Sequence, residues 1–175
     1  MASKIKVDTL ETANGSGTIA LSNQLTGMTT ASLPALGSAQ MPSGSVLQVV
    51  SGSTTTNTTS TSATFADTTL SASITPTSAS SKILILVDQN VRAAGNDSWL
   101  GLRILRGSVV VKQTSYLASS STGYANSQAA YNHLDSPNTT SATVYKTQFN
   151  KSQGTSARVQ DNNVISTITL MEIAQ

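Results

Sequence analysis

Short segments of apolar and β-branched residues recur from Val46 to the end of the chain, and turn residues separate them. The clearest segment is the apolar run 83–87 between Lys82 and Asp88, which is typical of a strand buried on both faces. Further strands are predicted at 46–50, 65–74, 99–105, 109–117, 128–133, 142–149 and 164–173. No window combines helical periodicity with helix caps, so about eight short strands predict an all-β sandwich, jelly roll or barrel.

Three connecting segments carry their own signals. Arg106-Gly107-Ser108 predicts a tight hairpin between the strands that flank it. The Ser/Thr tract 51–64 fits either an edge strand or an exposed loop, because threonine favours extended backbone. Segment 118–130 contains Gly123 and several serines, which predict a loop.

Hydroxyl side chains replace much of the charge that a globular chain ordinarily carries. The sequence has 28 serines and 26 threonines, nearly a third of its 175 residues, whereas charged residues make up 10%. The absence of cysteine excludes thiolate zinc sites, disulfides and thiol catalysis. A net charge of +2, with isolated basic residues, predicts no binding to nucleic acid.

No apolar run approaches the ~20 residues that a membrane-spanning helix needs, so we expect no membrane insertion. Residues 1–8 contain no apolar core of a secretory signal. We therefore expect a protein that is made in a cytosol and stays soluble.

The first 45 residues differ from the rest. Short strands are predicted at 5–10 and 18–22, with a turn at 14–17 between them. Segment 28–45 is rich in Pro, Gly and Ser and is typical of a linker. The predicted organisation is an attachment segment at 1–27, a linker at 28–45 and a β-sandwich at 46–175.

The attachment segment contains too few apolar residues to bury a core of its own, while ordering each residue costs about 1–2 kcal/mol of backbone entropy. One alternative is a flexible tail. The favoured alternative is that sister copies or a larger assembly cover its apolar side chains. These predicted attachment and oligomer contacts are Ile5, Val7, Leu10, Ile19, Leu21 and Leu25.

Candidate catalytic and metal-binding groups are few. His133 is the single histidine, and Asp135 would share its face of a strand, but no G-x-S-x-G turn supplies a nucleophile. The eight carboxylates are spread too evenly to nominate a glycosidase pair, and Asp88, Asp97 and Asp161 lack the spacing of a calcium loop. We predict no catalytic residue, no metal and no cofactor.

Aromatic residues offer candidate contact groups. Trp99 and Tyr145 have apolar neighbours and are predicted to lie in the core. Tyr124 and Tyr131 lie among Ser, Asn and Gln and are predicted to be exposed. Because aromatic faces stack on sugars or anchor proteins, these two tyrosines and His133 are candidate receptor contacts.

Several segments resemble structural proteins of tailed bacteriophages, especially short fibre-like proteins of phages that infect marine and freshwater bacteria. Segments 4–12 (KIKVDTLET) and 17–21 (GTIAL) look like the attachment end of such proteins, and 41–49 (MPSGSVLQV) looks like the start of their C-terminal domain. The segments that are similar to their sandwich heads are 73–85, 134–137, 145–149 and 168–173.

This resemblance implies a homotrimer on the virion surface, with an extended N-terminal anchor, a linker and a jelly roll packed around a threefold axis. Its other partners would be tail, collar or capsid proteins, and a host-surface glycan at the outer end. The chain has no long shaft, which keeps a capsid decoration or head-fibre protein as an alternative. A carbohydrate-active enzyme built on the β domain is a third hypothesis.

Overall fold

The computed structural model describes residues 37 and 40–175. The strands predicted at 5–10 and 18–22, their six apolar contact residues and most of the linker lie outside the described residues. The described elements are β1 (Val46–Thr54), β2 (Thr58–Ser60), β3 (Ala66–Ile74), β4 (Lys82–Ala94), β5 (Ser98–Arg106), β6 (Val109–Ser120), β7 (Tyr124–Asp135), β8 (Thr143–Gln153), β9 (Ser156–Val159), the 3₁₀ turn η3 (Asp161–Asn163) and β10 (Ser166–Ile173).

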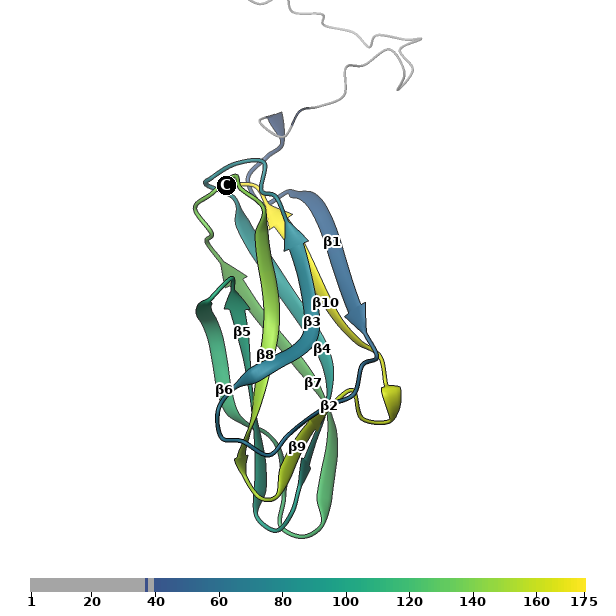
Figure 1. The fold of residues 1–175 in the computed structure, drawn as a ribbon. Coiled ribbons are helices and arrows are strands. Elements are labelled where there is room, and N and C mark those ends of the chain that lie inside the picture. The colour runs from purple at the N-terminus through teal and green to yellow at the C-terminus, as the bar shows by residue number, and fades with distance from the viewer. Residues whose placement is uncertain (1–36, 38–39) are drawn as a thin grey trace, which may run out of the picture. The chain divides into compact units, whose positions relative to one another are not determined.

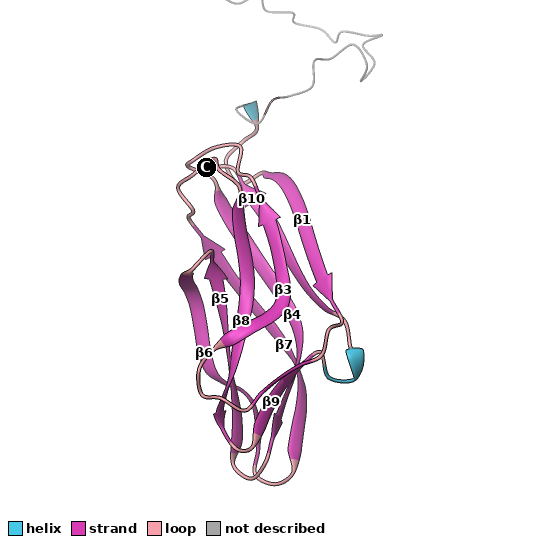
Figure 2. Cartoon of the chain, viewed as in Figure 1, coloured by secondary structure: helices cyan, strands magenta, loops and turns pink. Residues whose placement is uncertain are grey.

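These strands form two antiparallel sheets (Figures 1 and 2). In the first sheet, β4 pairs along one edge with β7. Along its other edge, the first half of β4 pairs with β10 and the second half pairs with β9. β1 extends this sheet beyond β10, and β2 extends it beyond β9. The second sheet has the order β3-β8-β5-β6. The eight longer strands thus run 1-10-4-7 and 3-8-5-6, which is the strand order of a jelly roll.

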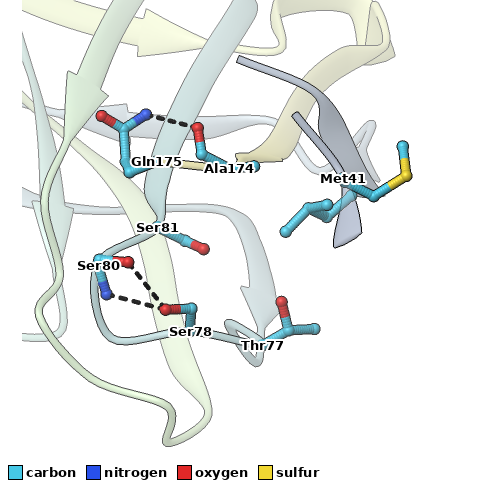
Figure 3. A pocket seen from close by; sticks show the side chains of 8 residues that line it. Met41, Thr77, Ser78, Ser80, Ser81, Ala174 and Gln175 are labelled. Atoms are coloured by element: carbon cyan, nitrogen blue, oxygen red, sulfur yellow. Dashed lines mark hydrogen bonds between the residues drawn. The ribbon is translucent and has the colours of Figure 1, made fainter. Parts of the chain in front are cut away.

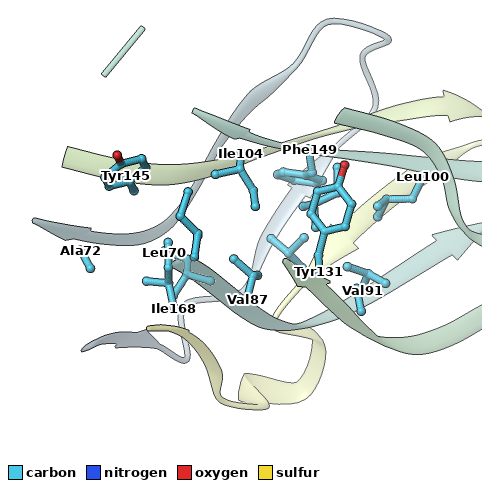
Figure 4. Close-up of a cluster of buried hydrophobic side chains, with 14 of the residues drawn as sticks. Leu70, Ala72, Val87, Val91, Leu100, Ile104, Tyr131, Tyr145, Phe149 and Ile168 are labelled. Carbon is cyan, nitrogen blue, oxygen red and sulfur yellow. The ribbon is translucent and has the colours of Figure 1, made fainter. Parts of the chain in front are cut away.

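The core lies between the sheets and is built by two-residue alternation along each strand (Figure 4). β4 turns Ile83, Ile85 and Val87 inward, whereas Leu84 is half-buried and Leu86 is 37% exposed. The prediction that 83–87 is buried on both faces is therefore wrong, because a two-layer sandwich covers only one face of each sheet. The all-β prediction is confirmed.

Of the two aromatic residues predicted to lie in the core, the structure buries one and leaves the other half-buried. Tyr145 is fully buried between the sheets, as predicted. Trp99 is only half-buried and packs edge-to-face on the exposed Tyr116, with 5.0 Å between ring centroids. The prediction fails for Trp99 because alternation along β5 places its inward neighbour Leu100 in the core instead.

Segment 118–130 is mostly strand rather than the predicted loop. It supplies the end of β6 and the beginning of β7, and only 121–123 turns. Twelve consecutive pairs with β4 hold β7 in place, so tertiary pairing overrides weak local propensity. The hairpin at 106–108 is confirmed, and tract 51–64 combines strand and loop.

The two ends of the sandwich differ. At one end, residues 44–45 pair with Ala174, through hydrogen bonds of 2.9 Å in each direction. This end, which holds residues 44–45 and Ala174, is called the proximal end (Figure 1). At the opposite, distal end the turn after β4 meets the turn before β7, and the Gly95 amide donates to the Gly123 carbonyl at 2.7 Å.

Candidate functional site

The outer face of the first sheet carries an apolar strip in its proximal half. Strand register aligns four side chains in one row across four strands, in the order Val49, Met171, Leu84 and Leu134. Leu86 on β4 adjoins this row. Val49 is 56% exposed and Leu134 is 49% exposed. We call these five residues the apolar strip.

Such a row is unusual on the solvent side of an antiparallel sheet, which ordinarily alternates apolar residues inward with polar residues outward. Part of the outer face of the second sheet follows the ordinary pattern. There, Gln148 accepts from Arg103 and donates to Asp67 at 2.7 Å, and Lys146 pairs with Asp67 at 2.9 Å. The apolar strip is therefore a candidate contact surface, whereas the corresponding part of the other face is occupied by polar pairs.

The distal half of the same outer face is polar. Register aligns Thr59, Arg158, Arg92 and Asn126 in a row across β2, β9, β4 and β7. Tyr124 lies on the same face of β7, two residues before Asn126, and is 60% exposed. We call Arg92, Arg158, Asp161, Tyr124 and Asn126 the distal platform.

Asp161, which follows β9, holds the two arginines of this platform. Its Oδ2 lies 2.8 Å from Arg92 Nη1, and its Oδ1 lies 3.5 Å from Arg158 Nη1. Asn57 also donates to Oδ1, at 3.3 Å. The hydrogen bond from Arg92 is the main reason that the pKa of Asp161 lies below its usual value, and it outweighs the opposing effect of burial. The carboxylate is therefore ionised at neutral pH.

Arg92 also lies against the aromatic ring of Tyr124. Its guanidinium carbon is 4.1 Å from the ring centroid, a cation–π contact. Since Asp161 pairs with the same guanidinium, Arg92 contacts both the carboxylate and the Tyr124 ring.

The three predicted receptor contacts do not share a surface. Tyr124 is exposed, as predicted. Tyr131 is only 8% exposed, so its predicted exposure is wrong: alternation along β7 turns it between the sheets, where Lys112 Nζ lies 4.6 Å from its ring centroid. Burial raises the pKa of Tyr131 to about 12. His133 is half-buried on the same inward face of β7.

His133 and Asp135 share one face of a strand, as predicted. Asp135 accepts hydrogen bonds of 2.7 Å from Tyr145 Oη and Arg106 Nη1. Within the described residues, no hydrogen bond joins His133 to Asp135. Asp135 thus links the two sheets through Tyr145 and Arg106 and does not orient His133 as a catalytic base.

Sequence reasoning missed the two arginines of the distal platform. Alternation along β4 places Arg92 on the outer face of the sheet, and this pattern could have indicated from the sequence that Arg92 is accessible. Nothing in the sequence places Arg158 beside it, because β9 joins β4 through a pairing between segments far apart in the chain.

Over the part of the chain that the structure describes, no three His, Asp or Glu side chains gather as a metal site. Asp161, one of the three carboxylates considered for calcium, is instead paired with arginine. Among the described residues, no helix is both long and apolar enough to cross a bilayer.

A pocket of about 300 Å³ opens at the proximal end (Figure 3). The residues that line it are Met41, Leu47, Thr77, Ser78, Ser80, Ser81, Ala174 and Gln175. Ser78 Oγ and Ser80 Oγ lie 2.9 Å apart on its wall, and Gln175 bonds to the carbonyl of Ala174. Its lining has no charged or aromatic side chain, so it offers a ligand only hydroxyl groups and the Gln175 amide as polar contacts.

No protein-family model matches the chain, and no curated protein matches it.

Proposed function

We propose that this chain is a non-enzymatic structural protein of a tailed-phage particle, a short fibre or spike-like appendage assembled from several copies. The particle holds its N-terminal segment, and the distal end of the jelly roll faces outward to contact the host surface. The quoted resemblance of 4–12, 17–21 and 41–49 to such proteins supports the family.

The observation that carries the proposal is the opposite placement of two surfaces along β4. Leu84, in the apolar strip, and Arg92, in the distal platform, are eight residues apart, or about 26 Å of strand. The chain arrives at the end that bears the apolar strip. A molecule attached from that side presents the Tyr124 end outward.

The apolar strip supports self-association. Burying apolar surface contributes about 25 cal/mol per Å², and a row of exposed and half-buried apolar side chains across four strands gives a second copy a surface to cover. The chain's low charge fits this arrangement, since copies with few charges repel one another weakly. Sister copies packed through this strip would form the appendage.

Static light scattering on the full chain tests the assembly. The unmodified protein should be oligomeric, and Leu134→Lys should shift it toward monomer because it places a charge in the strip. Val144→Lys is the matched control, since Val144 is 45% exposed on the other sheet. A wild-type monomer at every concentration, or equal effects of both variants, would contradict assembly through the strip.

Location on the particle needs a separate measurement. Gold-labelled antibody against the chain should mark phage particles at a few sites on the tail or collar. Many labels over the shell would favour the capsid decoration instead, and no label on purified particles would refute the virion assignment.

A further inference from the structure

We infer that the distal platform is a binding site for an acidic glycan, a carbohydrate that carries carboxylate or phosphate groups. The inference rests on the proposed function, in which the distal end faces the host surface.

The charge of the platform favours an anion. Two guanidinium groups meet a single carboxylate, Asp161, which is 5% exposed and already engaged by both. The nearest other carboxylates along this stretch of chain are Asp88, about 13 Å of strand from Arg92, and the exposed Asp97 in the turn after β4, whose amide donates to the Ser121 carbonyl. One positive charge therefore remains uncompensated among the platform residues.

Of the two arginines, Arg158 has the guanidinium that is available to a ligand. Its side chain is 41% exposed, whereas that of Arg92 is 22% exposed. Its contact with Asp161 is also the longer of the two, at 3.5 Å against 2.8 Å. A carboxylate or phosphate can thus pair with Arg158 while Arg92 stays on Asp161, and guanidinium groups suit both anions through bidentate hydrogen bonds.

Tyr124 supplies the contact for a sugar ring. Arg92 covers one side of the aromatic ring, yet the residue is 60% exposed, so much of its surface remains open. Aromatic faces offer an apolar surface that can stack on a sugar, and a ring already held in place loses little entropy on binding.

Amide side chains complete the surface. Asn126 and Gln128 are exposed on the same face of β7, beside Arg92 and Asn90 in the strand register. From Arg158 to β7 the platform crosses two strand spacings, about 10 Å, which is room for two linked sugars. The planar amides can bond to the hydroxyls of such a ligand. The exposed aromatic ring can stack on its ring face, and the guanidinium can pair with its acidic group.

Nucleic acid is the less favoured polyanion. Its binding depends on neutralising many phosphates, and this chain carries only a +2 net charge. The platform offers one uncompensated charge next to polar and aromatic groups, which suits a ligand with one acidic group every one or two sugars.

Affinity electrophoresis of the full chain tests the inference. Native gels would contain polygalacturonate, its fully methyl-esterified form, a phosphomannan or neutral dextran. We expect retardation by polygalacturonate or the phosphomannan, little retardation by the ester or dextran, and weaker binding at high salt. The two anionic gels distinguish carboxylate from phosphate as the favoured group.

Variants locate the site. Arg158→Gln should weaken the retardation about tenfold, and Tyr124→Leu should weaken it as well. Lys82→Gln is the matched control, because it removes the same charge at the proximal end. Thermal unfolding of each variant verifies folding, and Arg158→Lys, which keeps the charge, should recover part of the binding.

The inference is overturned if no anionic gel retards the protein, if the esterified polymer binds as well as the acid, or if Lys82→Gln weakens binding as much as Arg158→Gln. None of these results affects the outcome expected in the light-scattering and particle-labelling experiments. Failure of the ligand assignment is thereby distinguishable from failure of the proposed function.

Discussion

The phenolic hydroxyl of Tyr145, on the second sheet, donates a 2.7 Å hydrogen bond to Oδ2 of Asp135, at the end of β7 in the first sheet. Arg106, also on the second sheet, donates to the same oxygen at 2.7 Å. Burial first, and then the Asp135 carboxylate, raise the pKa of Tyr145 above its usual value. This link joins the two layers of the sandwich.

Removing the Tyr145 hydroxyl should destabilise the protein. Tyr145→Phe leaves the buried Asp135 with one donor fewer, and we expect the free energy of unfolding to fall by about 1–3 kcal/mol. Urea unfolding followed by circular dichroism measures the change.

Tyr131→Phe is the matched control for that experiment. Its buried hydroxyl has no hydrogen-bond partner among the described residues, so removing it should leave stability unchanged or raise it slightly. Equal losses in both variants would show that the Tyr145–Asp135 bond has no special role.

Acid should weaken the fold through Glu172. This fully buried carboxylate accepts from Gln48 Nε2 at 2.6 Å and from both the amide and the hydroxyl of Thr77 at 2.8 Å. Burial alone would raise its pKa, but these hydrogen bonds together lower it below 4.5. Its stabilisation is therefore complete above the unfolded pKa of 4.5 and is lost as pH falls toward the lower folded value.

Glu172→Gln provides the measurement. The amide cannot accept as many hydrogen bonds, so the variant should be less stable at pH 7, and it should lose less stability than wild type between pH 5 and pH 3. Parallel pH profiles for the two proteins would exclude Glu172 as a source of acid sensitivity.

Gly52 should tolerate no larger residue. A Cβ added there would lie 2.1 Å from the carbonyl oxygen of Ser71, where β1 of one sheet meets β3 of the other. Gly52→Ala must push the two strands apart, and we expect a loss of about 1–3 kcal/mol in urea unfolding. Gly107→Asn, in an open turn at φ 57°, is a control that should change stability far less.

Gln89 is expected to be replaceable with a gain in stability. It is fully buried on β4, and neither polar atom of its side chain bonds to a described residue. Gln89→Met keeps the shape and removes two unsatisfied groups, so the free energy of unfolding should rise by about 1–3 kcal/mol. A loss in thermal and urea unfolding would indicate that the amide has partners in solution, such as buried water.

Local patterns predicted much of this fold. Alternation and turn residues correctly indicated strands near 46–50, 65–74 and 142–149 and the hairpin around Gly107. They failed at 118–130, where Ser and Gly suggested a loop but pairing with β4 imposed strand. They failed again at Tyr131, whose polar neighbours suggested exposure although its own alternation turns it inward.

By itself, the sequence determined the all-β class, the positions of most strands, the lack of thiol chemistry and the exposure of Tyr124, since each follows from residue type and short-range periodicity. The tertiary structure decided which strands are neighbours. Only that pairing brings Arg158 beside Arg92 and aligns Val49 with Leu134 across the intervening strands. Cross-strand register depends on contacts between distant segments, and those contacts are set by how the whole core packs.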